Sequence, residues 1–230
     1  MIKILSVKTC RPDSTREAFR RHYEGRHVPL GLGFIDRFRW RKYVRNHVVA
    51  VHGGHVDFDC LTEFWVASRD DQESTRTFAA SPAFRVLDED DERFLDVTRR
   101  FSCELEEQLV AGTRPIFDPM GTRRIAAIFA RPESTDSLVF ARSISTEARR
   151  IASIGSLAGT RVTLDLRTSS GPRPTQFAAI VSTWSSPGTP PARLTGWVGH
   201  EPDAEVELEV VETPAGPLWP RNEGGAPTRA

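Results

Sequence analysis

The order of the predicted elements repeats once along the 230-residue chain, and this repeat limits the fold more than any other feature. In the first half, alternating hydrophobic and polar residues predict strands at 2–9, 38–51, 58–67 and 101–110. Helical patterns lie between them at 14–28, ending before Pro29, and at 69–79 and 88–96. In the second half, strand patterns return at 124–130, 160–168, 175–184 and 205–211, with helices at 134–154 and 191–198. The sequence therefore predicts two successive βαββαβ units.

Two units of this kind predict an α+β fold in which helices cover one face of each antiparallel sheet and leave the other face bare. We expect the two bare faces to pack sheet to sheet as a fused, pseudo-dimeric α+β barrel, with a small-molecule cavity between them. The expected domains are residues 1–110 and 122–212. A linker at 111–121, which contains two prolines and two glycines, joins them, and an extended or disordered tail follows at 213–230.

Composition excludes several classes of function. The 31 Lys and Arg residues balance the 31 Asp and Glu residues, so no net charge attracts nucleic acid or an anionic membrane. No apolar run approaches the roughly 18 residues of a membrane span, and the first residues do not have the pattern of a signal peptide. Three cysteines without C-x-x-C spacing predict neither a disulfide framework nor a zinc site. We expect a cytoplasmic protein that binds a hydrophobic small molecule, with no nucleic-acid or membrane partner.

His27 is the strongest single candidate for chemistry. A neutral imidazole with a pKa of about 6.5 can take a proton from an activated carbon and return it to a leaving hydroxyl group. The alternative is a histidine at the end of a helix, stabilised by the helix dipole and by hydrogen bonds to the last carbonyl groups. The residues leave both interpretations open.

The strand predicted near 58–66 carries a second set of candidates. Alternation puts Asp59, Glu63 and Trp65 on one face, while the other face has the composition of a core. Two carboxylates at this separation lie about 13 Å apart, too far to share a proton but close enough to frame one ligand. Trp65 would then be a stacking wall, and Glu63 an acid, a base or a group that orients a histidine. The alternative for Glu63 is an ion pair with an arginine of the neighbouring strand, namely Arg39, Arg41 or Arg45.

The strand predicted at 38–47 has polar residues on both faces. Tyr43 and His47 share one face, where they could donate hydrogen bonds to a phenol or carbonyl group, or the strand could be a solvated edge. His47, His52 and His55 flank a Gly53-Gly54 turn, but no carboxylate or cysteine at ligand spacing completes a metal site, and we predict none. Haem bound without a covalent link leaves no local signature. We interpret the acidic run at 88–92 as a solvated helix start.

Four segments of the first half carry a family resemblance. They are the opening strand with Lys3 and Lys8, the helix end Tyr23-Glu-Gly-Arg-His27-Val-Pro29, the strand Tyr43-Val-Arg-Asn-His47, and Phe58 to Trp65 followed by Asp91-Glu-Arg-Phe-Leu-Asp96. Residues 1–110 resemble the EthD family of ferredoxin-like proteins, whose members assemble as dimeric α+β barrels. The second half has no counterpart of His27, Asp59 or Glu63, so it resembles a degenerate ferredoxin-like repeat in topology only.

The resemblance implies a small-molecule role, because such barrels include cyclases, dehydratases and decarboxylases of aromatic polyketides, cofactor-free monooxygenases and accessory proteins of ether degradation. Our hypothesis is a cofactor-independent enzyme that cyclises, dehydrates or decarboxylates a polyketide-like, aromatic or carbonyl-rich molecule by acid–base chemistry. His27 would be the base, Asp59 or Glu63 would orient it or act as the acid, and Tyr43, His47 and Trp65 would hold the substrate. The alternatives are a non-catalytic metabolite-binding or accessory protein and a cofactor-free quinol monooxygenase. A homodimer is left open.

Overall fold

A computed structural model describes the chain except for residues 155–156, 158–159, 169–176 and 221–230. Among the described residues, eight antiparallel strands close into one barrel in the order β1-β3-β2-β8-β5-β7-β6-β4. Their bounds are β1 (Ile2–Lys8), β2 (Lys42–Gly54), β3 (Cys60–Val66), β4 (Phe101–Ala111), β5 (Arg123–Phe129), β6 (Arg161–Arg167), β7 (Ala179–Ser185) and β8 (Ala204–Glu212).

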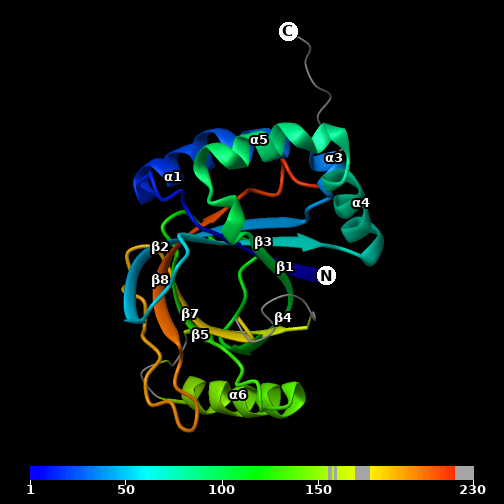
Figure 1. The fold of residues 1–230 in the computed structure, drawn as a ribbon. Helices are drawn as coiled ribbons and strands as arrows, with labels where there is room; N and C mark the ends of the chain where they lie inside the picture. Colours follow the sequence, from blue (N-terminus) through cyan, green and yellow to red (C-terminus); the bar gives the residue numbers. More distant parts are fainter. Residues whose placement is uncertain (155–156, 158–159, 169–176, 221–230) are drawn as a thin grey trace.

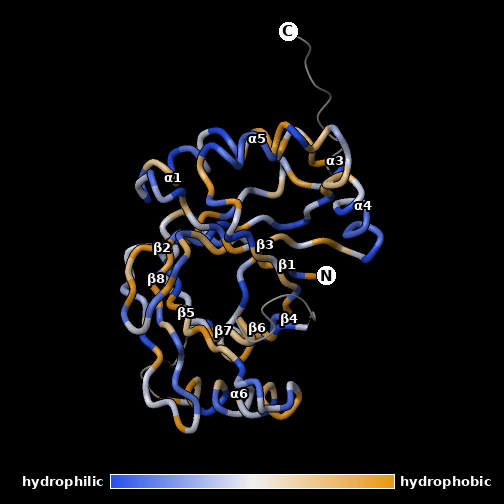
Figure 2. Tube along the Cα trace, viewed as in Figure 1, coloured by the Kyte–Doolittle hydropathy of each residue, from blue (hydrophilic) through white to orange (hydrophobic). Residues whose placement is uncertain are grey.

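Helices cover two opposite sides of this barrel (Figure 1). The first half contributes α1 (Arg16–His22), the π-helical turn η1 (Tyr23–His27), α2 (Val28–Leu32), α3 (Ile35–Phe38), α4 (Arg69–Ala79) and α5 (Arg85–Phe94), with 3-10 turns η2 (Pro82–Phe84) and η3 (Val97–Arg99). The second half contributes α6 (Ser137–Ala152) on the far side. The trace of α6 mixes hydrophobic and hydrophilic residues, as an amphipathic helix on a sheet requires (Figure 2). None of the helices in the described part of the chain is long and apolar enough to span a membrane.

The prediction of a mixed α+β fold with antiparallel sheets is confirmed. Each half contributes four adjacent strands with the same relative order, β4-β1-β3-β2 in the first half and β8-β5-β7-β6 in the second. The halves join where β2 pairs with β8 and β4 pairs with β6. They therefore meet edge to edge, and the backbone groups at the four outer strands find hydrogen-bond partners instead of remaining exposed.

The helix predicted at 191–198 is absent, since the described residues between β7 and β8 form no helix. Pro190 and Pro191 lack backbone N–H groups, and Gly196 has a positive φ of 78°, which a helix does not accommodate. Leu194 is nevertheless buried, and Trp197 packs edge-on against Phe129. An irregular segment with two hydrophobic anchors therefore covers this part of the barrel in the second half.

The segment expected to be a tail begins by packing against the first half. Thr213 and Leu218 are buried, and the backbone N–H of Trp219 donates a hydrogen bond to the Trp40 carbonyl over 3.0 Å. Residues 221–230, the rest of the expected tail, lie outside the described residues.

Two boundaries in the first half differ from the prediction. Pro29 does not end the helix, because it lies in the first turn of α2, where an N–H group is not needed for the helix. The strand predicted from residue 38 begins at Lys42, because Arg39 adopts a left-handed conformation (φ 55°) and ends α3. The chain then enters β2 from a turn that brings Trp40 under the helices.

Gly53 and Gly54 do not form the predicted hairpin turn, since both continue β2 and pair with β8. Gly54 has a φ of 68°, and a Cβ atom there would collide with the Asp203 carbonyl oxygen, whereas Gly53 has open space around it. We therefore expect Gly54→Ala to lower the free energy of unfolding by at least about 1–2 kcal/mol, which is the cost of holding a non-glycine residue in the left-handed conformation. The collision of the new Cβ atom with the Asp203 carbonyl oxygen would lower the stability further. Gly53→Ala is the matched control for urea unfolding. Equal stability of the two variants would contradict this geometry.

Candidate active site

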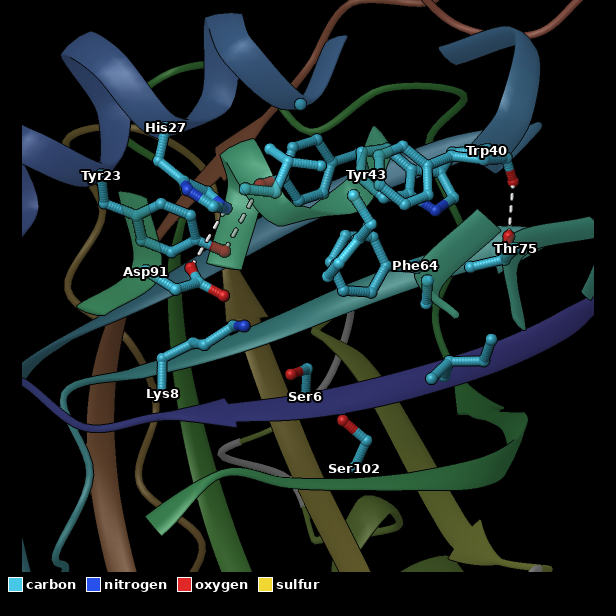
Figure 3. A pocket seen from close by; sticks show the side chains of 16 residues that line it. Ser6, Lys8, Tyr23, His27, Trp40, Tyr43, Phe64, Thr75, Asp91 and Ser102 are labelled. Atoms are coloured by element: carbon cyan, nitrogen blue, oxygen red, sulfur yellow. Dashed lines mark hydrogen bonds and ion pairs between the residues drawn. The ribbon is translucent and has the colours of Figure 1, made fainter. Parts of the chain in front are cut away.

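A cavity of about 250 Å³ lies between the outer face of the first half's sheet and the helices that cover it. Its apolar walls come from strands β1 and β3, the α3–β2 connection and α5. They include Ile4, Phe38, Trp40, Phe64 and Leu87. Polar side chains from β1, η1, β2 and α5 also line it, namely Ser6, Lys8, Tyr23, His27, Tyr43 and Asp91. Figure 3 shows His27, Tyr23, Asp91 and Lys8 at one end of this cavity and Trp40 and Thr75 at the other.

This cavity is not where the sequence predicted it. The expectation was a space between the two bare sheet faces, which is the interior of the closed barrel. The cavity with His27 instead lies on the opposite face of the sheet, under the helices. Part of the barrel interior is filled by apolar side chains such as Leu5, Leu61 and Leu208, and part by buried charges.

His27 ends the π-helical turn η1, whose wider backbone is closed by a hydrogen bond from Val28 N–H to the Tyr23 carbonyl. Its Nδ1 lies 3.1 Å from Asp90 Oδ2, and its Nε2 lies 3.4 Å from Asp91 Oδ1. Of these two contacts only the one to Asp90 has hydrogen-bond geometry, so we assign the ring proton of the neutral imidazole to Nδ1, which donates a hydrogen bond to Asp90. Nε2 is then left without a proton beside the cavity.

The pKa of His27 is lower than its usual value. Burial has the largest effect and lowers the pKa, Asp91 and Asp90 raise it, and the charge of Lys8 lowers it. The neutral imidazole therefore predominates at pH 7. The pKa of Asp90 is also lowered, because hydrogen bonds from Arg26, His22 and His27 outweigh the effect of burial.

The interpretation of the acidic run as solvated is wrong for two of its members. Helix α5 starts at Arg85, so Asp90 and Asp91 lie inside the helix and not at its N-terminal end. Both carboxylates are buried. The spacing of Leu87, Asp90, Asp91 and Phe94, at i, i+3, i+4 and i+7, is the signal that could have revealed this buried face.

Two tyrosines extend the polar end of the cavity. Tyr43 donates a hydrogen bond to the Tyr23 hydroxyl over 3.3 Å, and the Tyr23 and Thr62 hydroxyls lie 2.7 Å apart. Burial raises the pKa of both phenols, so both remain protonated hydrogen-bond donors. The structure brings Tyr43 together with His27 at the same cavity.

His47 lies on the same sheet face as Tyr43 but does not line the cavity. Its Nε2 lies 2.6 Å from Glu24 Oε1, and Arg45 also pairs with Glu24 over 2.9 Å. Burial lowers the pKa of His47, but Cys60 and Glu24 outweigh this effect and raise it to about 9. His47 is therefore a buried cation held by Glu24 at neutral pH.

The structure does not bring Asp59, Glu63 and Trp65 to the His27 cavity. Asp59 precedes β3 and accepts hydrogen bonds from Cys10 N–H (2.7 Å) and Arg16 Nε (2.8 Å). Glu63 and Trp65 line a separate cavity of about 210 Å³ on the barrel side of the sheet. The face of β3 that was interpreted as core carries Phe64, a wall of the His27 cavity.

Glu63 belongs to a buried network of charges in the barrel. It lies 3.1 Å from Lys3 Nζ and 2.6 Å from Arg124 Nη1. Asp165 binds the same two cations, at 2.8 Å from Lys3 Nζ and 3.3 Å from Arg124 Nη2. Burial raises the pKa of Glu63, but the charges of Lys3 and Arg124 outweigh it and lower the pKa to about 2. Its ion-pair partners are therefore these two residues and none of the three arginines considered from sequence.

The histidines near the predicted turn do not converge. His47 is buried against Glu24, whereas His52 lies 3.2 Å from Glu207 on the neighbouring strand. Within the described ranges, no group of three or more His, Cys, Asp or Glu side chains is arranged to hold a metal ion.

The electrostatics of His27 can be tested by substitution. Removing the negative charge in Asp91→Asn is expected to lower the pKa of His27 further, whereas removing the positive charge in Lys8→Met is expected to raise it. The measurement is an NMR titration of the imidazole carbon resonances in protein labelled at histidine. Shifts of the same sign in both variants would contradict the arrangement.

Known proteins support the fold and part of the family resemblance. Residues 11–98 match the EthD domain model, and this segment includes His27 and Asp91. No curated protein matches the chain. An anthrone oxidase-like protein of known structure shares 16% identity with a TM-score of 0.52, covering 94% of this chain and 93% of that chain. A protein from Fusobacterium nucleatum subsp. nucleatum, provisionally described as a monooxygenase, shares 12% identity with a TM-score of 0.46, covering 91% of each chain.

Proposed function

We propose that this protein is an enzyme that transfers protons on an aromatic small molecule bearing a carbonyl or phenol group, with His27 as the general base. The observation that carries the proposal is the His27 imidazole beside an aromatic-walled cavity, with one carboxylate facing each ring nitrogen. The EthD match over residues 11–98 is consistent with a small-molecule role.

The cavity suits a ring of modest size. An engineered apolar cavity of roughly 150 Å³ holds one benzene ring, so about 250 Å³ has room for a substituted or bicyclic ring. Phe64 and Trp40 provide aromatic walls against which such a ring can pack. The polar end, with His27 and Lys8, would then receive the oxygen-bearing end of the molecule.

The arrangement around His27 supports a proton shuttle. Nε2 takes a proton from an acidic C–H or O–H group, and Asp90 stabilises the resulting imidazolium through Nδ1–H. Asp91 Oδ1 has no hydrogen-bond partner of its own, so it can accept the new Nε2–H. The proton is then returned to a leaving hydroxyl or to a carbon, as cyclisation, dehydration or decarboxylation requires.

Among the residues proposed from sequence, His27 would keep its role as base and Tyr43 its role in holding the substrate through Tyr23. The other residues would support the site indirectly, because they hold the strands and the first helix in position; they are Asp59, Glu63, His47 and Trp65. The strand order of the two halves supports the further proposal that the chain is a fusion of two ferredoxin-like units, of which only the first is equipped for chemistry.

The test uses 2-tetralone, a bicyclic ketone with acidic C–H groups, in D₂O. The proposal expects the protein to accelerate deuterium incorporation beside the carbonyl, followed by proton NMR. Quenching of tryptophan fluorescence without faster exchange would instead favour a non-catalytic binding protein. Oxygen uptake with a naphthoquinol, without exchange, would favour a monooxygenase. Neither binding nor exchange with a panel of such rings would contradict the proposal.

A further inference from the structure

Lysine is rare in this chain, since only Lys3, Lys8 and Lys42 are lysines among the 31 basic residues. Two of the three are tied into ion pairs. Lys3 binds Glu63, Glu107 and Asp165, and Lys42 Nζ lies 3.0 Å from Glu212. Within the described part of the chain, no carboxylate lies within ion-pair distance of Lys8. Lys3 and Lys42 are held by carboxylates, whereas the amine of Lys8 lines a cavity and is available to a ligand.

Lys8 is the last residue of β1, and its side chain points toward the helices at the polar end of the cavity (Figure 3). Its nearest carboxylate of the cavity, Asp91, is already engaged. Asp91 Oδ2 binds Arg100 Nη2 over 2.9 Å, and Oδ1 faces His27 Nε2. The amine therefore faces a cavity with aromatic walls, and the carboxylate of that cavity is already engaged by other groups.

Burial favours the uncharged form of the Lys8 amine. Burial has the largest effect and lowers its pKa, Asp91 raises it, Arg100 lowers it, and Cys60 on β3 raises it. The pKa of Lys8 is below its usual value after these effects. A neutral amine is the nucleophilic form of lysine, and desolvation in an apolar pocket is one of the ways in which enzymes obtain it.

We propose that Lys8 forms a Schiff base with the carbonyl carbon of an aromatic ketone or aldehyde bound in the His27 cavity. This inference rests on the proposed function, since it names the substrate class of the same site. In that role the cavity's amine is a nucleophile that bonds to the substrate.

The steps balance without an oxidant or reductant. The Lys8 nitrogen lone pair forms a bond to the carbonyl carbon as the C=O π bond breaks. The neutral His27 moves a proton from the resulting ammonium nitrogen to the oxygen, which gives a carbinolamine. A proton taken up from solvent through His27 then lets the hydroxyl leave as water, and the nitrogen lone pair forms the C=N bond of a protonated imine. The protonated imine withdraws electrons more strongly than a ketone, so it favours removal of a neighbouring proton by His27 or loss of carbon dioxide from a β-keto acid. Hydrolysis by one water molecule then releases the ketone product and the free amine.

Reductive trapping tests this proposal directly. The intact protein is incubated at pH 7 with benzaldehyde and sodium cyanoborohydride, which converts an imine to a stable secondary amine, and the modified residue is located by peptide mass spectrometry. We expect label on Lys8 to exceed that on Lys42 several-fold. The label should be lost in Lys8→Met and retained in Lys42→Arg, the matched control.

The outcomes separate this inference from the proposed function. Label spread equally over Lys8, Lys42 and the N-terminal amine, or absent from Lys8, would overturn the Schiff base even if His27-dependent exchange is observed. Label on Lys8 in a protein that shows no exchange would instead support the nucleophile and contradict the proton transfer. The wild-type result does not depend on whether Lys8→Met folds.

Discussion

Replacing His27 with glutamine is expected to reduce the rate of deuterium exchange into 2-tetralone by about 10² to 10⁴, the range typical of a lost general base. Glutamine keeps the approximate size of the imidazole and can still donate a hydrogen bond to Asp90, but it cannot take up a proton. The loss should therefore appear in kcat and not in the affinity measured by fluorescence quenching.

The pH dependence gives an independent check on the same residue. Because the pKa of His27 is lowered, wild-type activity should fall on the acid side with an apparent pKa below 6.5, and this limb should be absent from the residual activity of His27→Gln. His55→Gln is the matched control, since His55 is exposed outside the cavity. Unchanged exchange in His27→Gln would remove His27 from the mechanism.

Replacing Arg124 with methionine is expected to lower the free energy of unfolding by about 3–5 kcal/mol, because it removes one of the two cations that compensate the buried carboxylates. The Arg124 side chain is fully buried, and its three nitrogens bind Glu63, Asp165 and Ser182. Lys3 would remain as the only cation shared by Glu63 and Asp165. Chemical denaturation with a linear extrapolation to zero denaturant measures the difference.

Two further variants make this result specific. Arg85→Met removes an exposed i,i+4 pair with Glu89 and should cost less than about 0.5 kcal/mol. Adding Glu63→Gln to Arg124→Met should recover part of the loss, because a neutral amide replaces the uncompensated charge. An Arg124→Met protein as stable as Arg85→Met would contradict a buried charge network across the barrel.

The local elements of this fold could be predicted well from sequence. Helix α4 begins at Arg69 and ends at Ala79, as its pattern indicates, with Ser68 as the N-cap. The strands follow the period-two alternation to within a few residues at most ends. The repeated element order predicted two similar units, and each half of the chain contributes four strands to the barrel.

The sequence could not show which face of each strand lines the site. Alternation separates Glu63 and Trp65 from Thr62 and Phe64, but both faces of β3 are buried, one against helices and one inside the barrel. Polarity therefore does not distinguish them. The main partner of Glu63 from the other half, Arg124, is 61 positions away in sequence, and only the closure of the barrel brings it near.

The carboxylates beside His27 were missed for a different reason. A run of acids at a helix start is usually solvated, and the interpretation depended on where α5 begins. A start at Arg85 moves Asp90 and Asp91 onto the buried face of the helix. A difference of about one helical turn in where a helix is predicted to begin thus decides whether an acidic side chain is assigned to the surface or to a site.

The most direct test of the central claim is a crystal structure of the protein with 2-naphthol, a bicyclic phenol that His27 can bind but not convert by loss of water or carbon dioxide. The account predicts the ring in the cavity of about 250 Å³ against Phe64, with its oxygen within hydrogen-bond distance of His27 Nε2 or Lys8 Nζ. A ring bound on the barrel side beside Trp65, or an empty His27 cavity at a saturating concentration, would contradict it.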